Sequence, residues 1–132
     1  VIGTPGYFAA AGMPQRPEDL LQHEMVIYHH RGGGEQWRFS RGEEQRMLRL
    51  PGRMRVNAAE CVRELVMADF GATVASEGMF RNELQSGAAI AALADWQLPP
   101  LALWAVFPGG HFVSAKARAF ADFVQTALCR EP

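Results

Sequence analysis

The sequence predicts an α/β domain in which short strands alternate with helices. Apolar residues make up 48% of the 132-residue chain, which is enough for the core of one ordinary domain. Short apolar or alternating runs, typical of strands, are separated by stretches in which apolar residues recur at helical spacing. Glycine, proline and capping residues stand between the two kinds of run. Strands and helices that alternate along a chain favour the α/β class.

The N-terminal part is expected to contain two short helices followed by strands. Thr4 can cap a helix that begins at Pro5, and Gly12 can end it. A second helix is expected to begin at Pro17, because acidic residues follow in its first turn and complement the helix dipole. The strands expected after it span residues 25–28, 36–40, 46–50 and 54–56.

From residue 57 onward the apolar period is that of a helix. Asn57 is a strong capping residue, and Glu60, three positions later, completes a capping-box arrangement. The expected buried stripe of this helix and its expected end are Cys61, Val62, Leu65, Val66 and Gly71. The later elements expected are a strand over 72–75, a helix from Ser76 to about Gln85, a strand over 89–93, a buried strand over 101–107 and a helix that Ser114 caps.

The stretch YHHRGGGEQWRF, residues 28–39, raises the question of a metal or phosphate site. His29 and His30 are neighbours near a strand end, where successive side chains point to opposite faces, so they cannot easily share a metal. No pair of histidines or cysteines has the spacing of a zinc site. The three glycines lack the Lys-Ser/Thr that completes a phosphate-binding loop. A surface connection between two strands is therefore favoured, with no metal and no cofactor.

The sequence contains little that indicates catalysis, nucleic-acid binding or membrane insertion. No serine lies in G-x-S-x-G, and Cys61 is expected to be inert within a buried helix stripe. The formal net charge is −1, and the arginines are interleaved with acids, which argues against a nucleic-acid surface. No apolar run approaches the roughly 18 residues of a membrane span. Two cysteines fit a reducing compartment, so we expect a cytoplasmic protein that is not an enzyme.

The order of the motifs is more specific than any one of them. The motifs, in chain order, are VIGTPGYFAAAGMPQRPEDLLQHEMVIYH, WRF, GRMRVNAAECVRELVMADFGATVAS and LALWAVFPGGHFVSAKARAFADFVQTAL. Together they resemble the effector-binding domain of LysR-type transcriptional regulators over nearly the whole chain. Two residues depart from the family pattern, because Asp69 stands where a glycine is usual and Ser76 where a proline is usual.

This resemblance implies a periplasmic-binding-protein-like fold of two α/β lobes joined by two crossover strands. By it, residues 1–132 are a partial effector-binding domain, with remnants of lobe I at 1–20 and 101–132 and a complete lobe II at 24–98. It further implies that DNA is bound only through a helix-turn-helix that this chain does not contain. Because lobe I is incomplete, we expect apolar edges to drive a homo-oligomer or a swapped dimer.

The resemblance also implies a small-molecule effector between the lobes. It points to six ligand-binding candidates, which are Thr4, Tyr28, Asn57, Ser76 and, as aromatic walls, Trp37 and Phe39. Core packing is the competing explanation for the two aromatic residues. Free amides at the helix start after Asn57 favour an anion, so a carboxylate or similar polar metabolite is expected. A stand-alone periplasmic-type solute-binding module, a small hydrolase and a dimerisation domain without a ligand stay open as alternatives.

Overall fold

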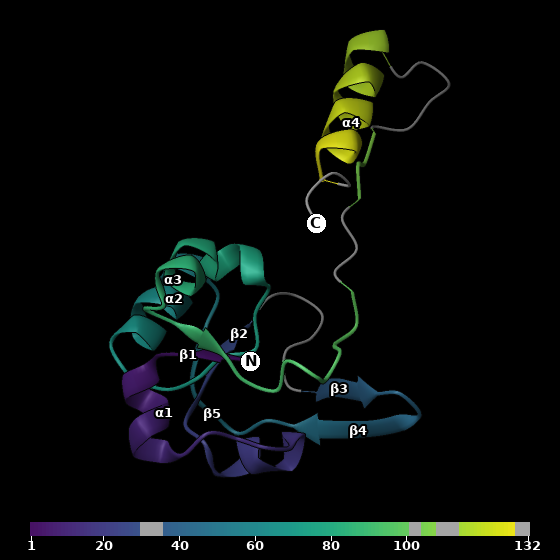
Figure 1. Cartoon of the computed structure of the whole chain (residues 1–132). Coiled ribbons are helices and arrows are strands. Elements are labelled where there is room, and N and C mark those ends of the chain that lie inside the picture. Colours follow the sequence, from purple (N-terminus) through teal and green to yellow (C-terminus); the bar gives the residue numbers. More distant parts are fainter. Residues whose placement is uncertain (30–35, 101–103, 108–113, 129–132) are drawn as a thin grey trace. The chain divides into compact units, whose positions relative to one another are not determined.

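The computed structural model describes residues 1–29, 36–100, 104–107 and 114–128 (Figure 1). The chain divides into two compact units, Val1–Pro99 and Pro100–Pro132. Strands and helices alternate along the first unit, which confirms the predicted α/β class. Of the predicted surface connection over 29–37, residues 30–35 lie outside the described residues.

A parallel pair of strands forms the centre of the first unit. β2 (Met25–Tyr28) pairs in parallel with β5 (Gly52–Val56). On the other side of β2 lies the segment 72–73, whose Ala72 carbonyl accepts a hydrogen bond from the Val26 amide at 2.8 Å. The strand predicted over 72–75 is thus present only as isolated bridges, although residues 72–74 are buried as expected.

The segment 72–73 also joins this centre to the N-terminus. Ile2 of β1 (Ile2–Gly3) and Thr73 exchange two backbone hydrogen bonds of 2.8 and 2.9 Å. β1 pairs antiparallel with β6 (Ile90–Ala91), a shorter strand than the one predicted over 89–93. These contacts place residues 1–20 in the same compact unit as residues 24–98. The assignment of the two segments to separate lobes stays a prediction. The contacts within the first unit do not divide the chain at residue 20.

Helices cover this centre, and their caps follow the local sequence. They are α1 (Pro5–Ala11), the 3-10 helix η1 (Pro17–Gln22), α2 (Ala59–Met67), the 3-10 helix η2 (Glu77–Phe80) and α3 (Arg81–Ser86). Thr4 caps α1, because its Oγ1 accepts a hydrogen bond from the Tyr7 amide at 3.0 Å. Gly87 ends α3 in the left-handed conformation, with φ of 76°. Val62 and Val66 of α2 are fully buried against Ile2 and Val26.

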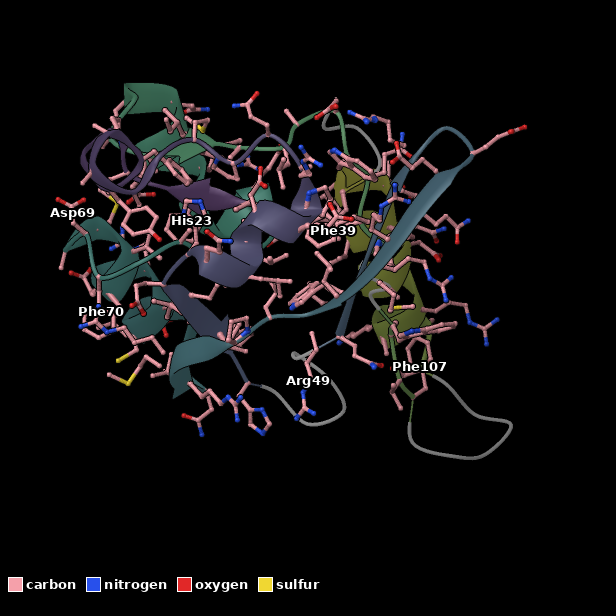
Figure 2. All side chains as sticks on the ribbon, turned by 90° about the horizontal axis from the view of Figure 1, so that it is seen from below. His23, Phe39, Arg49, Asp69, Phe70 and Phe107 are labelled. Carbon is pink, nitrogen blue, oxygen red and sulfur yellow. The ribbon has the colours of Figure 1, made fainter. Side chains whose placement is uncertain are left out.

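Two details of α2 differ from the prediction. Val62 and Val66 are buried as predicted, but Cys61 is exposed and does not belong to the buried stripe. The helix ends at Met67, before Gly71. Asp69 then adopts φ of 58°, a conformation that glycine adopts most readily, which fits the position where the resemblance expects glycine. Its carboxylate accepts a hydrogen bond from the Thr4 hydroxyl and so lies beside the start of α1 (Figure 2).

A β-hairpin completes the first unit and confirms the strands predicted over 36–40 and 46–50. β3 (Gln36–Arg41) and β4 (Glu44–Arg49) are joined by a tight turn in which Gly42 has φ of 58°. Ser40 exchanges backbone hydrogen bonds of 2.9 and 2.7 Å with Gln97. The Arg41 guanidinium lies over the Trp96 ring and pairs with Asp95 at 2.6 Å, so the hairpin holds the segment 95–97.

The second unit contains α4 (Ala115–Leu128). Ser114 caps it as predicted, since its Oγ accepts a hydrogen bond from the Ala117 amide at 3.2 Å. The buried strand predicted over 101–107 is wrong for the described residues 104–107, where the chain is irregular and Trp104 and Val106 are 79% and 87% exposed. A strand needs a neighbour for its backbone hydrogen bonds, and no described residue pairs with this segment. Residues 101–103 lie outside the described part.

His23 makes the stability of the first unit depend on pH. It ends η1, and its Nδ1 lies 3.1 Å from the Tyr7 hydroxyl of α1. Partial burial lowers the pKa of His23 below the ordinary value of 6.5, and Asp19 offsets this only in part. The unfolded chain therefore binds the proton more readily than the folded chain, so the free energy of unfolding falls as the pH drops through 6.5.

We expect His23→Gln to remove part of this pH dependence. Urea unfolding of both proteins between about pH 7.5 and 5.5, above the range in which most carboxylates titrate, measures the two slopes. The variant should show the shallower loss of stability. Equal slopes in the two proteins would assign the pH dependence to other groups.

Candidate functional site

The candidate site is a hollow of about 530 Å³ in the first unit. It lies where β2 and β5 end and α2 begins. Ligands of open α/β sheets bind outside the carboxyl ends of parallel strands, which is the place that this hollow occupies. Its lining residues are His29, Arg55, Val56, Asn57, Ala58 and Cys61.

Each lining residue is positioned by regular backbone structure. His29 directly follows β2, and its amide donates to the Val56 carbonyl at 2.7 Å, which holds the two strand ends together. Arg55 is the second-last residue of β5 and is exposed. Cys61 belongs to the first turn of α2 and is an exposed free thiol. The hollow therefore combines an arginine, a histidine, an amide side chain and a thiol above one helix start.

The structure corrects the predicted capping role of Asn57. The residue at the cap of α2 is Ala58, which has extended backbone angles (φ −117°, ψ 124°) and makes no side-chain capping bond. The Ala58 carbonyl accepts the helical hydrogen bond from the Val62 amide at 3.2 Å. The helix thus begins one residue later than predicted, and Asn57 lines the hollow and does not cap the helix. No side chain makes a capping hydrogen bond at the start of α2, so the first amides of this helix can bind an anion.

We therefore expect Asn57→Ala to change the free energy of unfolding by less than about 0.5 kcal/mol, as for an ordinary surface substitution. Removal of a true cap would cost about 1 kcal/mol. Urea unfolding distinguishes the two, and Thr4→Ala serves as the control that does remove a capping bond. A loss near 1 kcal/mol in Asn57→Ala would restore Asn57 as the cap.

The other polar candidates, Thr4, Tyr28 and Ser76, do not line this hollow. Tyr28 is half-buried against the core beside the hollow but is not among its lining residues. Thr4 is buried, caps α1 and donates to Asp69. Ser76 precedes η2 without a side-chain capping bond and lines a second hollow of about 330 Å³. That second hollow is lined by Ala59, Glu60, Arg63, Ser76 and Met79.

The two aromatic candidates pack against the core. Phe39 is 1% exposed and belongs to the cluster that contains Tyr7, Leu20 and Trp96. Trp37 is half-buried against the same cluster. Their rings alternate with exposed residues along β3, as expected for one covered face of a hairpin. Core packing accounts for both positions, and a role in ligand binding stays a prediction.

Sequence reasoning missed His29, Arg55 and Cys61 as lining residues. The sequence pattern raises His29 only as a metal ligand, and no group of three metal-ligating side chains occurs among the described residues. In the sequence Arg55 is one of many arginines expected at the surface, although its place near the end of a predicted strand is a usable signal.

Among the described helices, none is long and apolar enough to cross a membrane.

Comparison with known proteins identifies related chains. The family model described as LysR substrate binding domain matches residues 1–129. The HTH-type transcriptional regulator PtxR of Pseudomonas aeruginosa is 28% identical over 131 residues, which cover 99% of this chain and 42% of PtxR. The chain thus spans less than half the length of this relative.

Solved structures show the same fold. The regulatory domain of AphB from Vibrio vulnificus matches with a TM-score of 0.68 at 23% identity, over 96% of this chain and 62% of that one. The full-length Vibrio cholerae virulence activator AphB, a member of the LTTR protein family, matches with a TM-score of 0.66 at 24% identity, over 74% of this chain and 33% of that one. The periplasmic-binding-protein-like fold of such regulatory domains is therefore the fold of this chain.

Proposed function

Because this chain belongs to the LysR substrate-binding domain family, we propose that it is the ligand-sensing part of a bacterial LysR-type transcriptional regulator. The family is one of regulators and not of enzymes. In this proposal the chain binds a small-molecule effector in the cytoplasm, and a helix-turn-helix elsewhere in the parent protein binds DNA. The hollow at the ends of β2 and β5 is the observation that carries the proposal.

We further propose that the effector is a small carboxylate held in this hollow. The Arg55 guanidinium can pair with a carboxylate through two parallel hydrogen bonds. The first amides of α2 and the positive end of the helix dipole favour the same charge. His29 and the Asn57 amide supply further polar contacts at the rim. The effector domain would then act by a shift in population, since a ligand that binds one arrangement of the protein better stabilises that arrangement.

Thermal unfolding in the presence of small molecules tests this proposal. The probes are acetate, succinate and citrate, with propylamine and glucose as controls of other chemistry at matched ionic strength. A molecule that binds the folded state raises the Tm in proportion to the logarithm of its concentration. We expect at least one carboxylate to do so. A Tm that none of the carboxylates raises above the controls would contradict the choice of ligand class.

A further inference from the structure

The second hollow, of about 330 Å³, lies beside the first turn of α2 and has no assigned role. Consecutive residues at the start of α2 line the two hollows. Ala58 and Cys61 belong to the first hollow, the one at the ends of β2 and β5, and Ala59 and Glu60 belong to the second. The two hollows are therefore neighbours around one helix start.

Both hollows lie along one edge of the central strands. β2 and β5 run parallel, and Met25 of β2 also pairs in parallel with Ala72. The carboxyl ends of these three segments therefore face the same edge, with β2 in the middle. The first hollow lies at the ends of β2 and β5, and Ser76 of the second hollow follows the third segment. Neighbouring strands lie about 4.8 Å apart, so about 10 Å separates β5 from the segment 72–73.

The two hollows differ in charge. Among the described residues that line the first hollow, Arg55 is a cation and none is acidic. The second hollow contains Glu60, which is exposed and forms no ion pair with another described residue. Arg63, which also lines the second hollow, already pairs with Glu83 and, at 3.2 Å, with Glu64. The edge is therefore positive at the end of β5 and negative beside the segment 72–73.

We propose that one ligand spans both hollows and that it is an ω-amino acid, an unbranched chain with a carboxylate at one end and an ammonium group at the other. This inference rests on the function proposed above, since it takes the carboxylate to bind beside Arg55 in the first hollow. The ammonium group binds in the second hollow, where the Glu60 carboxylate and the Ser76 hydroxyl accept its hydrogen bonds. The Ser76 side chain makes no capping bond to η2.

The charges and their separation favour this class over other carboxylates. A dicarboxylate of the same length places its second negative charge against Glu60. An unbranched monocarboxylate reaches the second hollow but has no group that pairs with Glu60. An α-amino acid with an uncharged side chain carries both charged groups on one carbon atom, so it cannot reach two hollows that lie about 10 Å apart along the edge.

Isothermal titration of the whole chain with four probes tests the ligand class. The first probe is 6-aminohexanoate. Hexanoate lacks the ammonium group, adipate replaces it by a second carboxylate, and β-alanine has a chain too short to span the hollows. We expect 6-aminohexanoate to bind about tenfold or more tightly than each of the other three, because only this probe satisfies Glu60 and Arg55 together.

Glu60→Gln tests the proposed partner of the ammonium group. The affinity for 6-aminohexanoate should fall about tenfold, while the affinity for hexanoate stays within about threefold. Glu43→Gln is the control for charge alone, because Glu43 is exposed in the hairpin turn and lines neither hollow. It should leave both affinities within about threefold of those of the parent protein. Circular dichroism checks that both variants fold.

Backbone NMR of the parent protein gives a second readout that needs no variant. 6-Aminohexanoate should shift the amide signals of Arg63 and Ser76 in addition to those of the first hollow, and hexanoate should shift them less. If Glu60→Gln does not fold, this difference decides alone.

Two kinds of failure are distinguishable. Equal affinities for 6-aminohexanoate and hexanoate, or equal losses in Glu60→Gln and Glu43→Gln, would overturn the ω-amino acid and leave a carboxylate in the first hollow. If neither these probes nor succinate binds, the proposed carboxylate site fails, and this inference fails with it.

Discussion

Replacing Gly71 by alanine is expected to lower the free energy of unfolding by about 3 kcal/mol, at the upper end of the usual cost of overpacking. A Cβ at this position would lie 2.9 Å from the Glu24 carbonyl carbon and closer still to its oxygen, both of them backbone atoms. The backbone cannot withdraw without loss, because the Ala72 amide donates to this same carbonyl at 2.9 Å. The hydrogen bond between the Ala72 amide and the Glu24 carbonyl lies where the segment 72–73 joins β2, so the loss of this bond affects the centre of the first unit.

Gly78→Ala is the matched control. No atom lies within 4 Å of the Cβ that this substitution adds in η2, and the φ of Gly78 is not in the left-handed region. Urea unfolding of both variants should show a change below about 1 kcal/mol for Gly78→Ala. Equal, small losses in the two variants would mean that the close approach at Gly71 does not exist in solution.

Replacing Arg55 by glutamine is expected to weaken carboxylate binding by about 10- to 100-fold. Hydrogen bonds to charged groups contribute about 1.5–3 kcal/mol, and glutamine keeps the polar character while it removes the charge. Stability should change little, because Arg55 is exposed on β5. Isothermal titration with the carboxylate that raises the Tm most measures the loss of affinity.

Arg53→Gln is the control for charge alone. Arg53 lies on the same strand and on the same side of it, where it contacts the Phe70 ring and pairs with Glu24 at 3.8 Å, but it does not line the hollow. We expect the affinity of the Arg53→Gln variant for the carboxylate to stay within about threefold of the affinity of the parent protein. If both variants lose affinity equally, the ligand responds to the general charge of the surface and not to the hollow.

Local sequence signals predicted the caps and strands that depend on neighbouring residues. Thr4 and Ser114 cap their helices because a hydroxyl at that place bonds to an amide three positions later. The hairpin strands follow from alternation around a turn with glycine. The strand predicted over 101–107 failed over its described part, because an apolar run becomes a strand only where another strand pairs with it.

The candidate site was harder to predict than the fold. The role of Asn57 depends on the residue at which α2 begins, and a start one residue later makes Asn57 a lining residue in place of a cap. The exposure of Cys61 depends on the rotation of α2 about its axis. His29 and Arg55 come together only because β2 and β5 run in parallel, with Tyr28 opposite Val56. No local pattern shows which strands are neighbours, so this part of the hollow could not be read from the sequence alone.

The most direct test of the central claim is to map ligand binding on the backbone amides of this chain by NMR, with succinate as the probe and propylamine as the control. The hollow predicts that succinate shifts the amide signals of His29 and of Asn57–Cys61 and that these shifts saturate with one common Kd. Arg55→Gln should move the saturation to a succinate concentration about 10- to 100-fold higher without altering the remaining spectrum. Saturating shifts confined to another region, or no saturating shift with any of the three carboxylates, would contradict the placement of a sensing site in this hollow.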